Sequence, residues 1–235
     1  MARISETNKG RKDGGFTRLF EDPELGSLIS QVHATLIRAG TELEDLIAKH
    51  ARCMSEAEAL AFLNNNLIPD TYLITKKTLK KIIKPRLKPS LLIPSSASEY
   101  EKKLGEPDFI VVVVVGKQCH VIELKDGDAF DTKKSEGEVA KLEKFSTALQ
   151  DLKADYSVDW KVCFFHACDK SEIVSGFKGR ISNDNAITGK EFCDMLRISY
   201  ETIETQRRTD APENIKFFFK SLLEIPISRV YIREA

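Results

Sequence analysis

Residues 107–134 read PDFIVVVVVGKQCHVIELKDGDAFDTKK, and this stretch carries the strongest structural signal in the chain. An apolar run covers 109–115, and a short turn at Gly116 separates it from a second apolar run that ends at Glu123 and Lys125. Two β-branched runs joined by a short glycine-containing turn are typical of a β-hairpin. The sequence therefore predicts two antiparallel strands at this point.

Charged side chains gather at one end of this otherwise apolar hairpin. Strand pairing across a turn near Lys117 is expected to bring Asp108 within about one residue of facing Lys125. Side chains repeat with period two along a strand, so Glu123 and Lys125 share a face. Because burying such charges costs free energy unless they are paired or bind a metal ion, the cluster requires an explanation.

A hard divalent cation provides that explanation. Mg²⁺ prefers carboxylate oxygens and water, and Asp108, Glu123 and the backbone carbonyl of Leu124 can supply the protein ligands. Lys125 would then lie beside the ion, where it can orient or help deprotonate a bound water and balance phosphate charge. The alternative is a buried hairpin whose terminal charges are solvated.

The hairpin resembles the PD-(D/E)xK nucleases through Pro107, Asp108, Glu123 and Lys125. The segment that follows, DGDAFDTKKSEGE, looks like that of type II restriction endonucleases. The resemblance implies an α/β fold with a restriction-endonuclease-like core: a mixed β-sheet, made of the catalytic hairpin plus a parallel strand, flanked by helices and preceded by a helical N-terminal part.

The same resemblance implies a function. We expect a type II restriction endonuclease that hydrolyses phosphodiester bonds of double-stranded DNA at a short palindromic sequence, with Mg²⁺ as cofactor and a homodimer as the working form. Two alternatives remain open. One is another nuclease of the same core, such as a junction resolvase or a repair nuclease, and the other is a non-catalytic DNA-binding module.

Composition agrees with a globular protein and excludes some classes. The 235 residues are 42% hydrophobic and 31% charged, with a net charge of zero, so total charge does not indicate a nucleic-acid binder. The chain shows neither a signal peptide nor an apolar run long enough to span a bilayer, which favours a cytoplasmic prokaryotic protein without membrane contact. We interpret Cys163, His166 and Cys168 as buried strand residues.

The predicted domain organisation is simple. Residues 1–15 form a flexible basic arm, and 16–235 form a single nuclease domain. Within it we expect a helical and basic DNA-contact part at 16–95, the catalytic core at 96–168, and a recognition or dimerisation part at 169–235.

A long helix is predicted from Asp22, which caps it, to about Arg52. On a helical wheel Glu44 shares a flank with Ile37, so it is the half-buried acid of this segment. Many PD-(D/E)xK enzymes place an extra glutamate from an N-terminal helix at the metal site, and the resemblance therefore makes Glu44 a candidate catalytic residue. A surface acid on an amphipathic helix is the equal alternative.

Basic residues are concentrated between Lys76 and Lys88, where seven of thirteen residues are Lys or Arg. Such a stripe suits contacts with DNA phosphates, although a solvated charged face is the alternative. Arg180 lies in the loop-rich segment 170–185 and is a candidate for reading guanine. The predicted DNA-binding residues are Lys76, Lys77, Lys80, Lys81, Lys133, Lys134 and Arg180.

Beyond the hairpin, Ser135 and Glu138 form a predicted capping box that opens a helix. An apolar run at 158–167 follows that helix and is expected to add a strand parallel to the hairpin through a β-α-β crossover.

Overall fold

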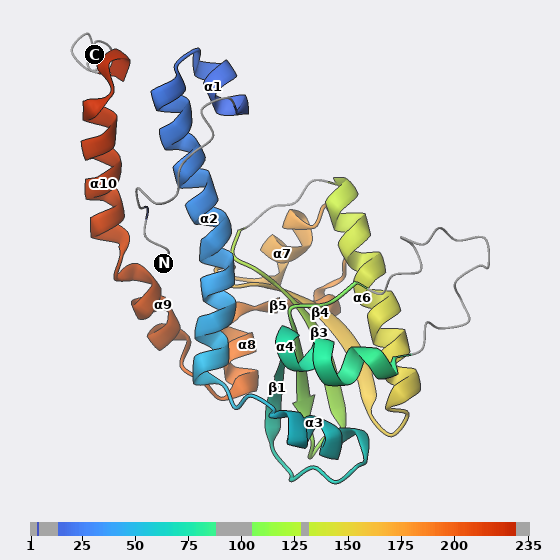
Figure 1. The fold of residues 1–235 in the computed structure, drawn as a ribbon. Coiled ribbons are helices and arrows are strands. Elements are labelled where there is room, and N and C mark those ends of the chain that lie inside the picture. Colours follow the sequence, from blue (N-terminus) through green and yellow to red (C-terminus); the bar gives the residue numbers. More distant parts are fainter. Residues whose placement is uncertain (1–3, 5–13, 88–104, 128–131, 229–235) are drawn as a thin grey trace. The chain divides into compact units, whose positions relative to one another are not determined.

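The computed structural model describes residues 4, 14–87, 105–127 and 132–228. These residues belong to two compact units: one contains the chain up to Leu46 and from Glu201 onward, and the other contains Ile47–Tyr200. Figure 1 shows the elements of both, and each unit is described by itself.

The central unit is built on a mixed β-sheet. Among the described residues the sheet has five strands in the order β1-β2-β3-β4-β5. The pairs β1–β2 and β2–β3 are antiparallel, and β3–β4 and β4–β5 are parallel. The strands are β1 (Thr71–Thr75), β2 (Phe109–Val113), β3 (Gln118–Lys125), β4 (Ser157–Phe164) and β5 (Ala186–Thr188).

The predicted fold class is confirmed by this sheet, because the hairpin β2–β3 and the parallel strand β4 occur as expected. The helix between β3 and β4 provides the crossover that parallel strands require. Two edge strands, β1 and β5, were not predicted from the sequence.

The helices of this unit flank the sheet (Figure 1). The short helix α4 continues into a π-helical turn, and π-helices are uncommon in proteins. The helical segments are α3 (Glu56–Leu63), α4 (Lys76–Thr78), the π-helix η1 (Leu79–Ile83), the 3₁₀-helix η2 (Lys84–Arg86), α6 (Thr132–Leu152), α7 (Lys170–Gly176), the 3₁₀-helix η3 (Asn183–Asn185) and α8 (Gly189–Leu196).

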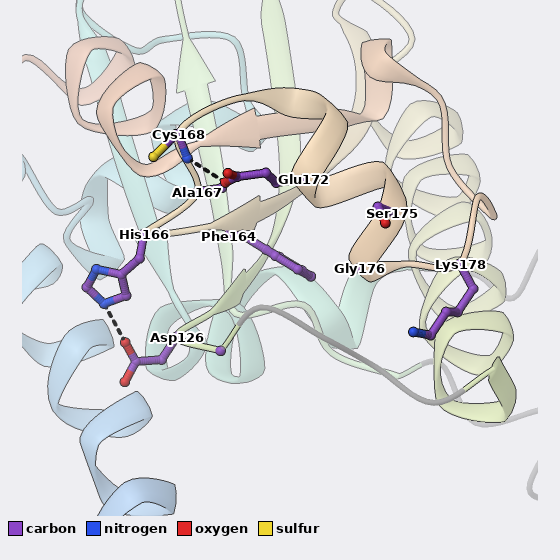
Figure 2. Close-up of a pocket in the computed structure, with 10 residues that line it drawn as sticks. Asp126, Phe164, His166, Ala167, Cys168, Glu172, Ser175, Gly176 and Lys178 are labelled. Atoms are coloured by element: carbon purple, nitrogen blue, oxygen red, sulfur yellow. Dashed lines mark hydrogen bonds and ion pairs between the residues drawn. The ribbon is translucent and has the colours of Figure 1, made fainter.

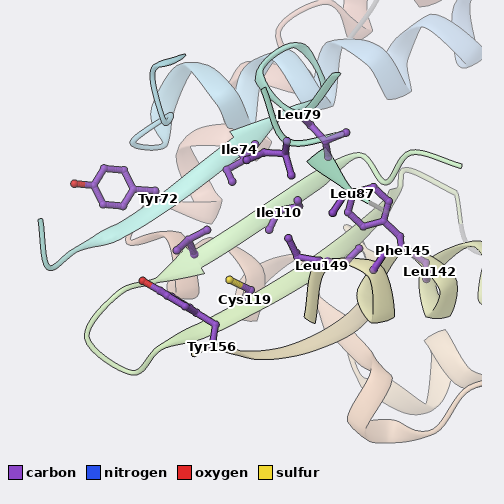
Figure 3. Packing of buried hydrophobic residues seen from close by; sticks show 14 of the residues in the cluster. Tyr72, Ile74, Leu79, Leu87, Ile110, Cys119, Leu142, Phe145, Leu149 and Tyr156 are labelled. Carbon is purple, nitrogen blue, oxygen red and sulfur yellow. The ribbon is translucent and has the colours of Figure 1, made fainter. Parts of the chain in front are cut away.

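The hydrophobic core lies between α6 and one face of the sheet, as Figure 3 shows. The helical stripe of α6 places Leu142, Phe145 and Leu149 on the side that faces the strands, and all three are fully buried. Strand alternation turns Ile74 and Ile110 toward the same core. This packing fixes which residues of α6 reach the end of the hairpin.

Two local predictions are wrong. The helix α6 begins at Thr132, so Ser135 lies inside the helix and is buried rather than capping its end. No helix-breaking residue separates Thr132 from Ser135, and the helix therefore extends one turn further than the capping pattern suggested. The segment 170–185 is not mainly loop either, because it contains α7, which is capped by Asp169.

The second unit is helical. It contains α1 (Gly15–Phe20), most of α2 (Pro23–His50), most of α9 (Tyr200–Arg208) and α10 (Ala211–Glu224). Asp22 caps α2 as predicted, because its Oδ1 accepts hydrogen bonds from the N–H groups of Glu24 and Leu25. Within the described part of the chain no helix has the length and apolarity needed to cross a membrane.

Candidate active site

Three charged residues lie side by side at one end of the sheet. The last registered pairs join Thr75 to Phe109 and Phe109 to Ile122. Lys76, Asp108 and Glu123 are the next residues of these three segments at that end of the sheet. The Nζ atom of Lys76 lies 2.5 Å from Oδ1 of Asp108. The backbone N–H of Asp108 donates a hydrogen bond of 3.1 Å to the carbonyl of Ile122, and its carboxyl feels the charge of Glu123. Asp108 therefore lies beside Glu123, and the prediction that it comes within about one residue of facing Lys125 is wrong. The reason is that β2 ends at Val113, earlier than expected, which moves the turn.

Asp108 is buried, with a relative exposure of 6%. Its Oδ2 accepts a hydrogen bond of 2.7 Å from the backbone N–H of Leu124. Burial raises the pKa of the Asp108 carboxyl, and the charge of Glu123 raises it further, while Lys76 and the Leu124 N–H oppose both effects. The net result is a raised pKa, because the fold disfavours the charge of this carboxylate.

Glu123 is still more buried, with a relative exposure of 3%. Its Oε1 accepts a hydrogen bond of 2.6 Å from Nζ of Lys125, which agrees with the expectation that both side chains share a face of β3. Its Oε2 accepts a hydrogen bond of 2.7 Å from Nζ of Lys141, on α6. Both carboxylate oxygens therefore bind ammonium groups.

Lys141 was not predicted as a site residue. It directly precedes the core residue Leu142, but Lys144 precedes the core residue Phe145 in the same way and is exposed. No local pattern in the sequence therefore singles out Lys141. Lys76 was predicted only as a DNA contact, and its ion pair with Asp108 places it at the site as well.

The basic stretch after β1 is partly neutralised by acids. Nζ of Lys80 and of Lys84 lie 3.1 Å and 2.5 Å from the carboxylate of Glu106, and Nζ of Lys81 lies 2.6 Å from Glu56. Glu106 thus ties this stretch to the segment that enters β2. Burial raises the pKa of Glu106, but the hydrogen bonds from Lys84 and Lys80 outweigh burial and lower it.

The other predicted DNA-binding residues occupy several places. Lys77 and Lys134 are exposed. Arg180 lies 2.6 Å from Glu136, at the start of α6. Lys133 is in the first turn of α6, and its side chain lies outside the described residues. DNA contact by all these residues stays a prediction.

Glu44 lies on α2 in the helical unit and is half-buried, as expected, but the neighbouring Glu42 is half-buried as well, so the helical wheel does not separate the two acids. Its participation in the active site stays a prediction.

A pocket of about 750 Å³ opens just beyond the carboxyl end of β3 (Figure 2). Nε2 of His166 lies 3.0 Å from Oδ1 of Asp126 at one side of it. Cys168 is exposed, and Cys163 is buried in β4. The interpretation of His166 and Cys168 as buried strand residues is therefore wrong, because β4 ends at Phe164 and both residues leave the sheet.

The ligands available to a metal ion at the site are hard oxygens. In the described part of the chain, no group of three or more His, Cys, Asp or Glu side chains is arranged to hold a metal ion. A cation at the end of the hairpin would therefore rely on two carboxylates, a backbone carbonyl and water, a set that suits Mg²⁺ better than Zn²⁺.

A mixed sheet in which Pro-Asp opens one strand of a hairpin and Glu-Leu-Lys ends the next is the architecture of the PD-(D/E)xK nucleases. Comparison with known proteins shows which kind of PD-(D/E)xK nuclease the chain is similar to. The chain is 40% identical over 241 residues to the type II restriction enzyme HhaII of Haemophilus parahaemolyticus, and the match covers 100% of this chain and 99% of that enzyme. The chain therefore belongs to the type II restriction enzyme family. No protein-family model and no solved structure matches it.

Proposed function

We propose that this protein is a type II restriction endonuclease that hydrolyses double-stranded DNA at a short palindromic sequence and depends on Mg²⁺. The observation that carries the proposal is the group of Asp108, Glu123 and Lys125 at the end of the hairpin. The similarity of the whole chain to HhaII supports the same conclusion.

Asp108, Glu123 and the carbonyl of Leu124 would hold the metal ion. The residue before Asp108 is Pro107, which has no N–H to donate to a carbonyl of β3. The chemistry that a bound Mg²⁺ supplies is activation of water and stabilisation of the leaving 3′ oxygen.

We assign to Lys125 the role of positioning the attacking water. Its ammonium group is held 2.6 Å from Glu123, so it lies beside the proposed ligands and is only 19% exposed. From there it orients the water for in-line attack on phosphorus and balances the phosphate charge. The products of such attack are 5′-phosphate and 3′-hydroxyl ends. Glu44 is the proposed third acid and fourth catalytic residue.

Substrate binding is assigned to the basic residues that the sequence predicts as DNA contacts. Lysines hold the phosphate backbone and fix the register of the duplex, and Arg180 is a candidate for base contact. A two-fold homodimer would place one catalytic group at each strand of a palindromic site. The proposed phosphate contacts are Lys76, Lys77, Lys80, Lys81, Lys133 and Lys134.

The test is cleavage of unmethylated phage DNA by purified protein with Mg²⁺, followed by sequencing of the fragment ends. Asp108→Ala and Lys125→Ala are compared with Lys144→Ala, a control on the exposed side of α6. Discrete fragments that share one palindrome, present with the control and absent with both site variants, are expected. Intact duplex with cleavage of a four-way junction would instead favour a resolvase, and binding without any cleavage would refute catalysis.

A further inference from the structure

Glu123 is held by two ammonium groups that come from different elements. Lys125 is two residues along the same strand, whereas Lys141 approaches from α6. With Lys76 on Asp108, the described residues place three ammonium groups against two buried carboxylates. A metal ion that binds Glu123 would share its oxygens with these ammonium groups, and the repulsion between like charges makes the lysines its competitors.

Lys141 is built into its position. Its side chain is only 20% exposed. Its aliphatic stem packs against Gly105, where an added Cβ would lie 2.5 Å from Cγ and 2.7 Å from Cδ of Lys141. Gly105 stands three residues before Asp108, so the segment that enters the catalytic strand also supports this lysine.

Lys141 already has a second acidic partner. Its Nζ forms an ion pair with Oε2 of Glu138, three residues earlier on α6. Burial lowers the pKa of Lys141, but Glu123 and Glu138 together outweigh it and raise the pKa, so the side chain carries its charge. If Lys141 leaves Glu123, it stays in its ion pair with Glu138, so its displacement from Glu123 costs little free energy.

We infer that Lys141 is a positioning residue of the active site, which competes with the metal ion for Oε2 of Glu123 and is held by Glu138 alone when Glu123 becomes a metal ligand. This inference rests on the proposed function. The pair Lys141–Glu138 then sets the affinity of the site for divalent cations.

The experiment is calorimetric titration of the DNA-free protein with Mg²⁺, and with Ca²⁺ as a second probe. Lys141→Met is compared with Lys144→Met, which removes the same charge from the exposed side of the same helix. We expect the apparent Kd for the metal to fall by about tenfold in Lys141→Met, because a competing cation next to the ligand is gone. Lys144→Met should leave the Kd unchanged.

Glu138→Gln provides the second arm. It removes the alternative partner of Lys141, so the metal should bind several-fold more weakly than in the wild type. In the Lys141→Met background the same substitution should not change the metal affinity, because Glu138 affects metal binding only by holding Lys141. Lys141→Gln, checked by circular dichroism, replaces Lys141→Met if that variant does not fold.

The outcomes separate the two proposals. Metal affinity that is lost in Asp108→Ala but unchanged in Lys141→Met would overturn the inference and leave the proposed metal site intact. Metal affinity that Asp108→Ala does not alter would overturn both, because the ion would then bind elsewhere.

Discussion

Two substitutions of Asp108, to asparagine and to alanine, should affect cleavage equally but differ in their effect on stability. Its carboxylate is buried and its pKa is raised, first by burial and then by Glu123, so the charge of Asp108 is unfavourable in the folded protein. Asp108→Asn and Asp108→Ala remove this charge equally, and both should abolish cleavage. In the wild type, the backbone N–H of Leu124 donates a hydrogen bond of 2.7 Å to Oδ2 of Asp108. The two variants differ in whether this N–H keeps an acceptor.

The magnitude of the difference follows from that hydrogen bond. The asparagine carbonyl can still accept from Leu124, whereas alanine leaves a buried N–H without its acceptor, at a cost of about 1–3 kcal/mol. For a chain of this size each kcal/mol shifts the melting temperature by about 2–4 °C. We therefore expect Asp108→Asn to melt roughly 2–12 °C above Asp108→Ala. Relief of the buried charge should also make Asp108→Asn at least as stable as the wild type.

The assay is thermal and urea unfolding in the presence of EDTA, with cleavage measured in parallel with Mg²⁺. Lys76, the ion-pair partner of Asp108, is partly exposed and can turn to solvent in both variants, so its contribution cancels in the comparison. Equal stability of the asparagine and alanine variants would refute the argument, because Leu124 would then have found another acceptor.

Three further predictions concern other parts of the molecule. Lys77→Ala should lower the slope of log binding constant against log salt by about 1, if this exposed lysine contacts a phosphate; an unchanged slope in a filter-binding series would exclude the contact. Gly189→Ala should destabilise the protein by about 1–3 kcal/mol in urea, because its Cβ would overlap a backbone carbonyl, whereas the control Gly137→Ala meets open space and should be neutral or stabilising. Burial raises the pKa of Asp159, but the hydrogen bonds from His120 and a neighbouring lysine outweigh it and lower the pKa. The stabilisation is therefore present above the unfolded-state pKa and lost as the pH falls through the folded-state pKa, so Asp159→Asn should cost stability at pH 7 and none in strong acid; a pH-independent difference in unfolding free energy would contradict this.

Local patterns in the sequence were sufficient for the hairpin and its charges. The β-branched run before Gly116 favours a strand, and period-two alternation then puts Glu123 and Lys125 on one face. The apolar stripe of α6 is equally local, since helical periodicity selects Leu142, Phe145 and Leu149 as its core face. Capping boxes, which are also local patterns, form at Ser55 and Thr188.

Repeating patterns in the sequence predict the class of fold and place two acids and a lysine at one end of the hairpin. Packing in three dimensions brings Asp108 beside Glu123, pairs Lys76 with Asp108, and brings Lys141 of α6 to Glu123. The physical reason is that periodicity assigns a side chain to a face of its own element. Register across a turn depends on where the strand ends, and the meeting of a helix with a strand depends on how their apolar faces pack.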